Sequence, residues 1–109
     1  MKEYFSTYSK EQVFVLDDDG DNYSSFDLAI KAIKENIMSS SQNIKHDFLD
    51  GGSGYFVKDG ITVKISCSNW DGTELRVEGE ILTELELQKV RQWALEIYNA
   101  IHNNESPQI

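Results

Sequence analysis

The chain has 109 residues, which is enough for one domain with a modest hydrophobic core. Its hydrophobic share of 39% and its aromatic share of 11% are typical of a folded domain rather than of a disordered chain. A formal charge of −9 disfavours binding to nucleic acid or to anionic membranes, and it favours basic proteins or cations as partners.

The first predicted elements are a strand, an acidic turn and a helix. QVFVL, residues 12–16, has the β-branched and apolar composition of a strand, and the acidic, glycine-containing segment after it is typical of a turn. Ser24 or Ser25 can cap the helix that follows. Apolar residues recur at helical spacing, at Phe26, Ala29, Ile30, Ile33 and Ile37. This stripe should face a core.

The helix is expected to end at SSSQ, residues 39–42, and NIKHDFL, residues 43–49, could form another strand. Residues 55–81 then alternate between apolar and polar side chains, which predicts a three-stranded antiparallel meander with turns at VKDGI and NWDGT. In NWDGT we predict a three-residue loop with Gly72 in the left-handed region, because a two-residue turn would set apolar residues opposite charged ones. The same logic applied to VKDGI completes the predicted pairs, which are Cys67 with Leu75, Ile65 with Val77, Val57 with Ile61 and Tyr55 with Val63.

A second helix is predicted after the meander, since Thr83 and Glu86 have the spacing of a capping box. Its apolar stripe consists of Leu87, Val90, Ala94, Ile97 and Ile101. We therefore predict an α+β fold, in which two amphipathic helices pack on one face of an antiparallel sheet of about four strands. The predicted core between these layers is Val63, Ile65, Val77, Ile30, Ile33, Val90, Ala94 and Ile97. Residues 1–102 should form a single domain and residues 103–109 a frayed tail.

The segment LDDDGDNYSSFDL, residues 16–28, concentrates acidic side chains. An EF-hand loop needs carboxylates at positions 1, 3 and 5, glycine at 6 and glutamate at 12, and no starting residue in this segment meets that pattern. We interpret the cluster as an acidic patch that steers a basic partner, with a solvated turn or weak, nonspecific cation binding as alternatives. The patch consists of Asp17, Asp18, Asp19 and Asp21.

A second candidate surface lies on the predicted meander. Trp70 falls at a hairpin tip, where an indole either folds back onto the sheet or projects as an interface anchor. The acidic residues Glu74, Glu78 and Glu80 follow it on the next strand and its end. Lys64 is expected to face Glu78 across the ladder.

No catalytic residue, cofactor site or metal site is predicted, and we expect no enzyme. His46 and its neighbour Asp47 should point to opposite faces of a strand, so His46 is interpreted as a partly buried structural residue. His102 should lie in the last helix, where it favours the C-terminal dipole. Cys67 is the single cysteine, which excludes an internal disulfide, and it has no basic neighbour in sequence to lower its pKa.

In size, charge and organisation over the whole chain, the sequence resembles bacterial immunity proteins, the antitoxins of contact-dependent inhibition and other polymorphic toxin systems. The resemblance implies tight binding to a basic toxin domain, often a nuclease, and neutralisation of its activity. Without an apolar run of roughly 20 residues or an apolar N-terminal segment, a cytoplasmic location is expected.

Two alternatives stay open. A chaperone of the type III secretion kind is similarly small and acidic, although such chaperones usually begin with a helix and form dimers. An inhibitor that mimics nucleic acid, and thereby blocks a defence protein, also fits the charge. Sedimentation would reveal the dimeric chaperone, and competition with DNA would reveal the mimic.

Overall fold

The computed structural model describes residues 1–18, 24–38, 45–49, 52–68 and 72–104. Within these ranges the chain forms six strands and two helices, the first of which ends in a π-helical turn, η1. The elements are β1 (Lys2–Ser6), β2 (Glu11–Asp17), α1 (Ser24–Ala32), η1 (Ile33–Ile37), β3 (Lys45–Leu49), β4 (Ser53–Lys58), β5 (Ile61–Ser68), β6 (Gly72–Glu78) and α2 (Glu84–Asn104).

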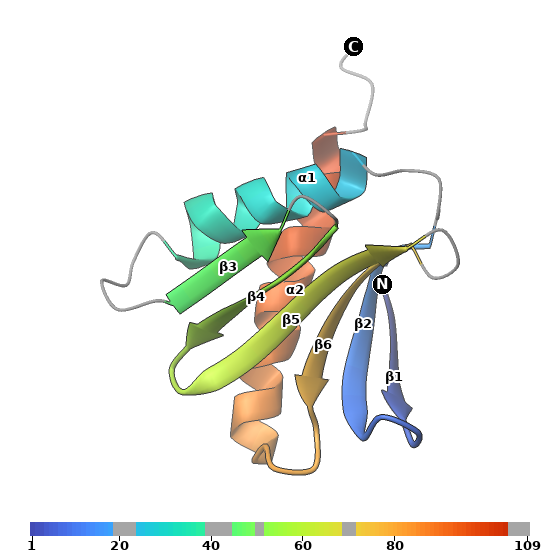
Figure 1. Ribbon diagram of the computed structural model, residues 1–109, viewed down its shortest axis with the longest axis vertical. Coiled ribbons are helices and arrows are strands. Elements are labelled where there is room, and N and C mark those ends of the chain that lie inside the picture. Colours follow the sequence, from blue (N-terminus) through green and yellow to red (C-terminus); the bar gives the residue numbers. More distant parts are fainter. Residues whose placement is uncertain (19–23, 39–44, 50–51, 69–71, 105–109) are drawn as a thin grey trace.

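The six strands form one sheet in the order β1-β2-β6-β5-β4-β3, and every neighbouring pair is antiparallel. Both helices lie on the same face of the sheet (Figure 1). The predicted α+β class is confirmed, but the sheet has six described strands rather than about four. The strand that sequence reasoning missed is β1, because each of its faces mixes polar and aromatic residues and no alternation is visible.

β4 and β5 are joined by a two-residue turn, Asp59–Gly60, rather than by the predicted three-residue loop. The two turn residues have positive φ angles of 54° and 77°, as a type I′ turn requires. Phe56 therefore lies opposite Val63, and both predicted pairs across this turn are wrong. A shift of one residue exchanges the faces of a strand, so Phe56 is buried and Tyr55 is 40% exposed on the other face.

β5 and β6 pair two residues away from the predicted register. Ile65 lies opposite Leu75 rather than Val77. Because a shift of two residues keeps each side chain on its face, the predicted inward face is nevertheless right. Gly72 has a φ of 74°, as predicted, and a Cβ there would overlap the carbonyl oxygen of Asp17, so only glycine fits where β6 passes the end of β2.

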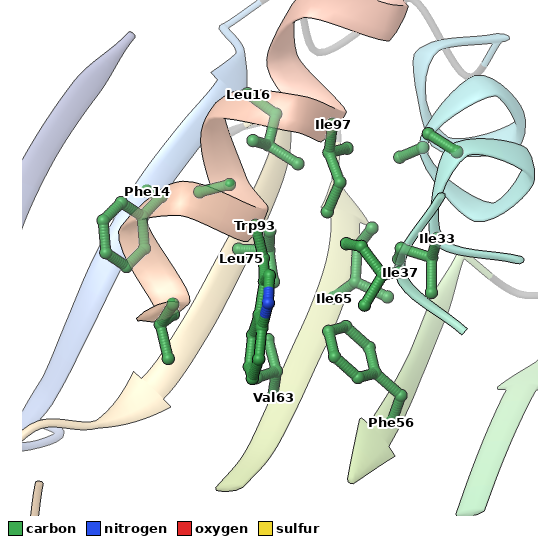
Figure 2. Packing of buried hydrophobic residues seen from close by; sticks show 14 of the residues in the cluster. Phe14, Leu16, Ile33, Ile37, Phe56, Val63, Ile65, Leu75, Trp93 and Ile97 are labelled. Carbon is green, nitrogen blue, oxygen red and sulfur yellow. The ribbon is translucent and has the colours of Figure 1, made fainter. Parts of the chain in front are cut away.

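The hydrophobic core lies between the sheet and the two helices (Figure 2). All predicted core residues are buried there except Ile30, which is partly buried. The ring of Trp93 meets Phe56 edge-on, with centroids 5.9 Å apart, and thereby connects α2 to β4. Residues that the sequence analysis did not assign to the core, including Phe14, Leu16 and Leu75, are also fully buried.

Side chains form hydrogen bonds with backbone groups at the start of α2 and at the end of η1. The Thr83 N–H donates to Glu86 Oε1 at 3.0 Å and the Glu86 N–H donates to Thr83 Oγ1 at 3.2 Å, which confirms the predicted capping box. At the end of η1, Lys58 Nζ donates to the carbonyl oxygen of Ile37 at 2.6 Å. α2 continues to Asn104, two residues past the predicted end of the domain.

Candidate partner-binding surface

The sheet face that the helices leave uncovered, called here the open face, carries a network of charged side chains. Along β5 the inward residues are buried while Thr62 and Lys64 on the open face are exposed. Arg76 lies opposite Lys64 on one side and opposite Val13 on the other. The network members come from four neighbouring strands and are Tyr4, Glu11, Lys64, Glu74 and Arg76.

Two carboxylates of the network are almost covered, since Glu11 is 8% and Glu74 is 3% exposed. Glu11 accepts hydrogen bonds from Lys64 at 3.3 Å and from Arg76 at 3.5 Å. Glu74 accepts one from Arg76 at 2.9 Å and one from the Tyr4 hydroxyl at 3.4 Å. The guanidinium of Arg76 thus bridges both carboxylates and holds β2 and β6 together on this face.

The pKa values follow from these contacts. Burial raises the pKa of Glu11, but hydrogen bonds from Lys64 and Ser9, the charge of Lys64 and a bond from Arg76 together hold it below its ordinary value. Burial lowers the pKa of Arg76, but the hydrogen bond and charge of Glu74, a hydrogen bond to Glu11 and the charge of Tyr4 together raise it above its ordinary value. Glu11 and Arg76 are therefore both charged at neutral pH.

The structure brings Asp17, Asp18 and Glu74 to one hollow of about 420 Å³ at the end of β2, called here the acidic hollow. Asp18 is exposed, and Asp17 accepts a hydrogen bond from the hydroxyl of Ser25 at the start of α1. Lys2 also lines the acidic hollow. The remaining members of the predicted patch, Asp19 and Asp21, and the predicted anchor Trp70 lie outside the described residues.

A β-bulge shapes this end of β2. Val15 lies opposite Glu74 and Asp17 lies opposite Thr73, so Leu16 is the extra residue. His102 Nε2 lies 2.8 Å from the carbonyl oxygen of Leu16, within hydrogen-bonding distance of a group that the bulge removes from the regular ladder. His102 is in the last turn of α2, as predicted, but its contact with β2 carries no signal in the sequence.

The structure divides the second predicted surface, because Glu74 lines the acidic hollow with Asp17 and Asp18 while Glu78 and Glu80 lie elsewhere. Glu78 and Glu80 line a different hollow, of about 290 Å³, at the opposite end of β2, where Glu80 lies 3.8 Å from Lys10. The seven residues of β2 separate the two ends by roughly 20 Å. Glu74 is occupied by Arg76 and nearly buried, so it offers a partner little surface. The predicted pair of Lys64 and Glu78 is replaced by Lys64 with Glu11.

β1 is held against α2 by a further ion pair that sequence reasoning missed. Arg91 donates to both carboxylate oxygens of Glu3, at 2.9 Å and 2.8 Å, and Gln12 donates to Glu3 at 2.6 Å. The hydrogen bond from Arg91 lowers the pKa of Glu3 and outweighs the opposing effect of burial. This bidentate ion pair joins residues that are 88 positions apart, so no local sequence pattern predicts the pair.

A measurable pH dependence follows from the Glu3–Arg91 pair. Because the pKa of Glu3 is lower in the folded chain than its ordinary 4.5, ionised Glu3 stabilises the fold above that value, and the contribution is lost as the pH falls through the folded pKa. The Arg91→Met variant should therefore lose less stability than the parent between about pH 5 and pH 3, as measured by urea unfolding. Gln92→Met, an exposed neutral control on the same helix, should keep the parent profile. If the free energy of unfolding fell equally with pH in the parent and in Arg91→Met, the assignment of this pH dependence to the Glu3–Arg91 pair would be wrong.

Of the residues considered for catalysis, His46 and Cys67 lie apart from the acidic hollow, whereas His102 lines it. His46 is exposed, with its ring stacked on Phe48 at 5.1 Å, so the predicted partial burial is wrong; β3 is an edge strand and the helices do not cover His46. Asp47 points to the opposite face, as predicted. Cys67 is buried on the inward face, also as predicted.

Within the described ranges, no group of three or more His, Cys, Asp or Glu side chains is arranged to hold a metal ion. Of the described helices, none has the length and apolarity that crossing a membrane requires. No protein-family model, curated protein or solved structure matches this chain.

Proposed function

We propose that this chain is a small acidic binding protein of the immunity type, which binds and neutralises a basic toxin domain. The observation that carries the proposal is the placement of Asp17 and Asp18 at the rim of the acidic hollow in a chain of charge −9. A lysine or arginine side chain of a partner that entered the hollow would meet these two carboxylates.

The charge balance around the hollow supports a cationic protein as the partner. Glu74 is paired with Arg76, and Lys2 offsets one further charge, so the described lining of the hollow keeps a negative surplus from Asp17 and Asp18. Such a surplus attracts cationic protein surfaces and repels phosphate groups. A nuclease must present a cationic surface to its own substrate, so it is the class of toxin that this chemistry fits best.

Capture from the native cell tests the proposal. The immobilised protein should retain a basic protein from the cell extract, and salt should weaken this retention because the attraction is electrostatic. The upstream neighbouring gene should encode the retained protein. Retention of a metabolite or metal ion in place of a protein would show that the proposal is wrong. Displacement of the retained protein by DNA would favour the nucleic-acid mimic instead.

The association rate gives a sharper test of the acidic patch. Converting Asp17, Asp18, Asp19 and Asp21 together to asparagine should slow association with the captured partner by at least ~10-fold at low salt, and the difference should shrink at high salt. Surface plasmon resonance at two salt concentrations measures both effects. Asp27→Asn/Glu35→Gln/Glu84→Gln/Glu96→Gln is the matched control for net charge, since it also removes four negative charges and all four residues lie on helical elements outside the hollow. Equal rates for the patch variant and the parent at low salt would remove the patch from the interface.

A further inference from the structure

β1 is an edge of the described sheet, with a strand neighbour, β2, on one side. Half of the large hydrophobic side chains that are exposed in the described residues lie within residues 1–8. They include Phe5, which is 41% exposed, and Tyr8, which is 99% exposed. Exposed edge strands offer unpaired backbone donors and acceptors to any extended segment that approaches them.

The two edge strands of the described sheet, β1 and β3, differ in the charged side chains that oppose pairing with another strand. β3, the opposite edge, carries Lys45, His46 and Asp47 in succession, and all three are exposed. Charged side chains of this kind discourage pairing with another strand. On β1 the carboxylate of Glu3 is occupied by Arg91 and Lys2 is the other charged residue, while Tyr4, Phe5 and Ser6, and residues 7–9 of the turn that follows, are uncharged. β1 is therefore the edge that is open to pairing.

We propose that an extended segment of the basic partner adds to the sheet as a strand beside β1 and places an arginine in the acidic hollow. The start of β1 connects these two features, since Lys2 and Tyr4 line the same hollow as Asp17 and Asp18. Neighbouring strands lie about 4.8 Å apart, so an arginine at the end of the added strand that lies beside Met1 and Lys2 can extend past the start of β1 towards Asp18, which is exposed, while Asp17 is bonded to Ser25 on the helix side. This inference rests on the proposed function and adds the mode of recognition.

Charge decides between a foreign strand and a second copy of this chain. Antiparallel pairing of β1 with itself would bring together two chains that each carry −9. Like charges of this size oppose association, whereas a basic segment gains from the same field. Recognition by strand addition takes its affinity from backbone hydrogen bonds and its selectivity from a few side chains that enter pockets, here the acidic hollow.

The probe is a fluorescein-labelled synthetic peptide that repeats arginine-valine-threonine-valine, with a matched peptide in which glutamate replaces arginine. Fluorescence anisotropy should show saturable binding of the basic peptide, at least ~10-fold tighter than the acidic one. Hydrogen exchange should slow at the backbone amides of residues 2–6 and stay unchanged at residues 45–49. Phe5→Lys should weaken binding at least ~10-fold, while Ile81→Lys, at another exposed apolar position, should stay within ~2-fold.

Every other outcome overturns the inference. Absence of binding, equal binding of both peptides, or binding without slower exchange in residues 2–6 each excludes strand addition by a basic segment. Protection of those amides in the free protein, with a mass that rises with concentration in sedimentation, would show self-pairing instead. Thermal melting of Phe5→Lys and of the parent distinguishes a loss of folding from a loss of binding. A basic protein retained in the capture experiment without protection of β1 would leave the proposed function standing and remove only the inference.

Discussion

Replacing Phe56 with alanine should lower the free energy of unfolding by about 3–5 kcal/mol. Phe56 is fully buried, lies opposite Val63 and contacts Trp93 of α2, so truncation leaves a cavity where the meander meets the second helix. Neither the sheet backbone nor the helix can close such a cavity without losing other contacts. Urea unfolding of the parent and the variant measures the difference.

The neighbouring residue provides the control. Tyr55→Ala removes a side chain of similar size from the open face and should cost less than about 1 kcal/mol. The pair of variants reports directly on the turn at Asp59–Gly60, because a three-residue loop there would place Tyr55 in the core and Phe56 outside. A larger loss for Tyr55→Ala than for Phe56→Ala would therefore show that the two-residue turn is wrong.

Replacing Arg76 with leucine should cost about 3 kcal/mol, the lower end of what is typical when one partner of a buried ion pair is removed. The variant leaves Glu74 with its remaining contact to Tyr4, and Glu11 with Lys64. The loss is placed at the lower end because the Arg76 side chain is 27% exposed and water reaches part of the network. Urea unfolding at neutral pH measures it.

Two further variants test whether burial of the carboxylates causes this loss. Lys64→Met removes a network cation that is 55% exposed, and it should cost at most about 1 kcal/mol. Glu74→Leu combined with Arg76→Leu removes the buried charge along with its partner and should recover much of the stability lost by Arg76→Leu alone. Similar small losses for Arg76→Leu and Lys64→Met would mean that the network is a solvated surface cluster.

Charge alone located the acidic segment in the sequence, and the role of its residues in partner binding stays a prediction. The acidic segment after β2 was recognised, and Asp17 and Asp18 do line a hollow. The assignment of Glu74 to a docking surface did not anticipate its burial, because exposure of a strand residue depends on which cation faces it across the sheet. The aromatic edge at β1 was missed, since an edge strand is covered incompletely on both faces and lacks alternation.

The amino-acid sequence by itself determined the two helices, the capping box at Thr83 and Glu86, and the inward face of β5, because each depends on spacing over a few residues. Only the tertiary structure decided the order of the strands and the contacts that this order creates. β2 and β6 are separated by more than half of the chain in sequence. Their pairing brings Arg76 to Glu11 and Thr73 to Asp17. A periodic pattern records which face of a strand is buried but not which strand lies beside it. The neighbour is selected when the whole sheet closes over the helices and buries their common core.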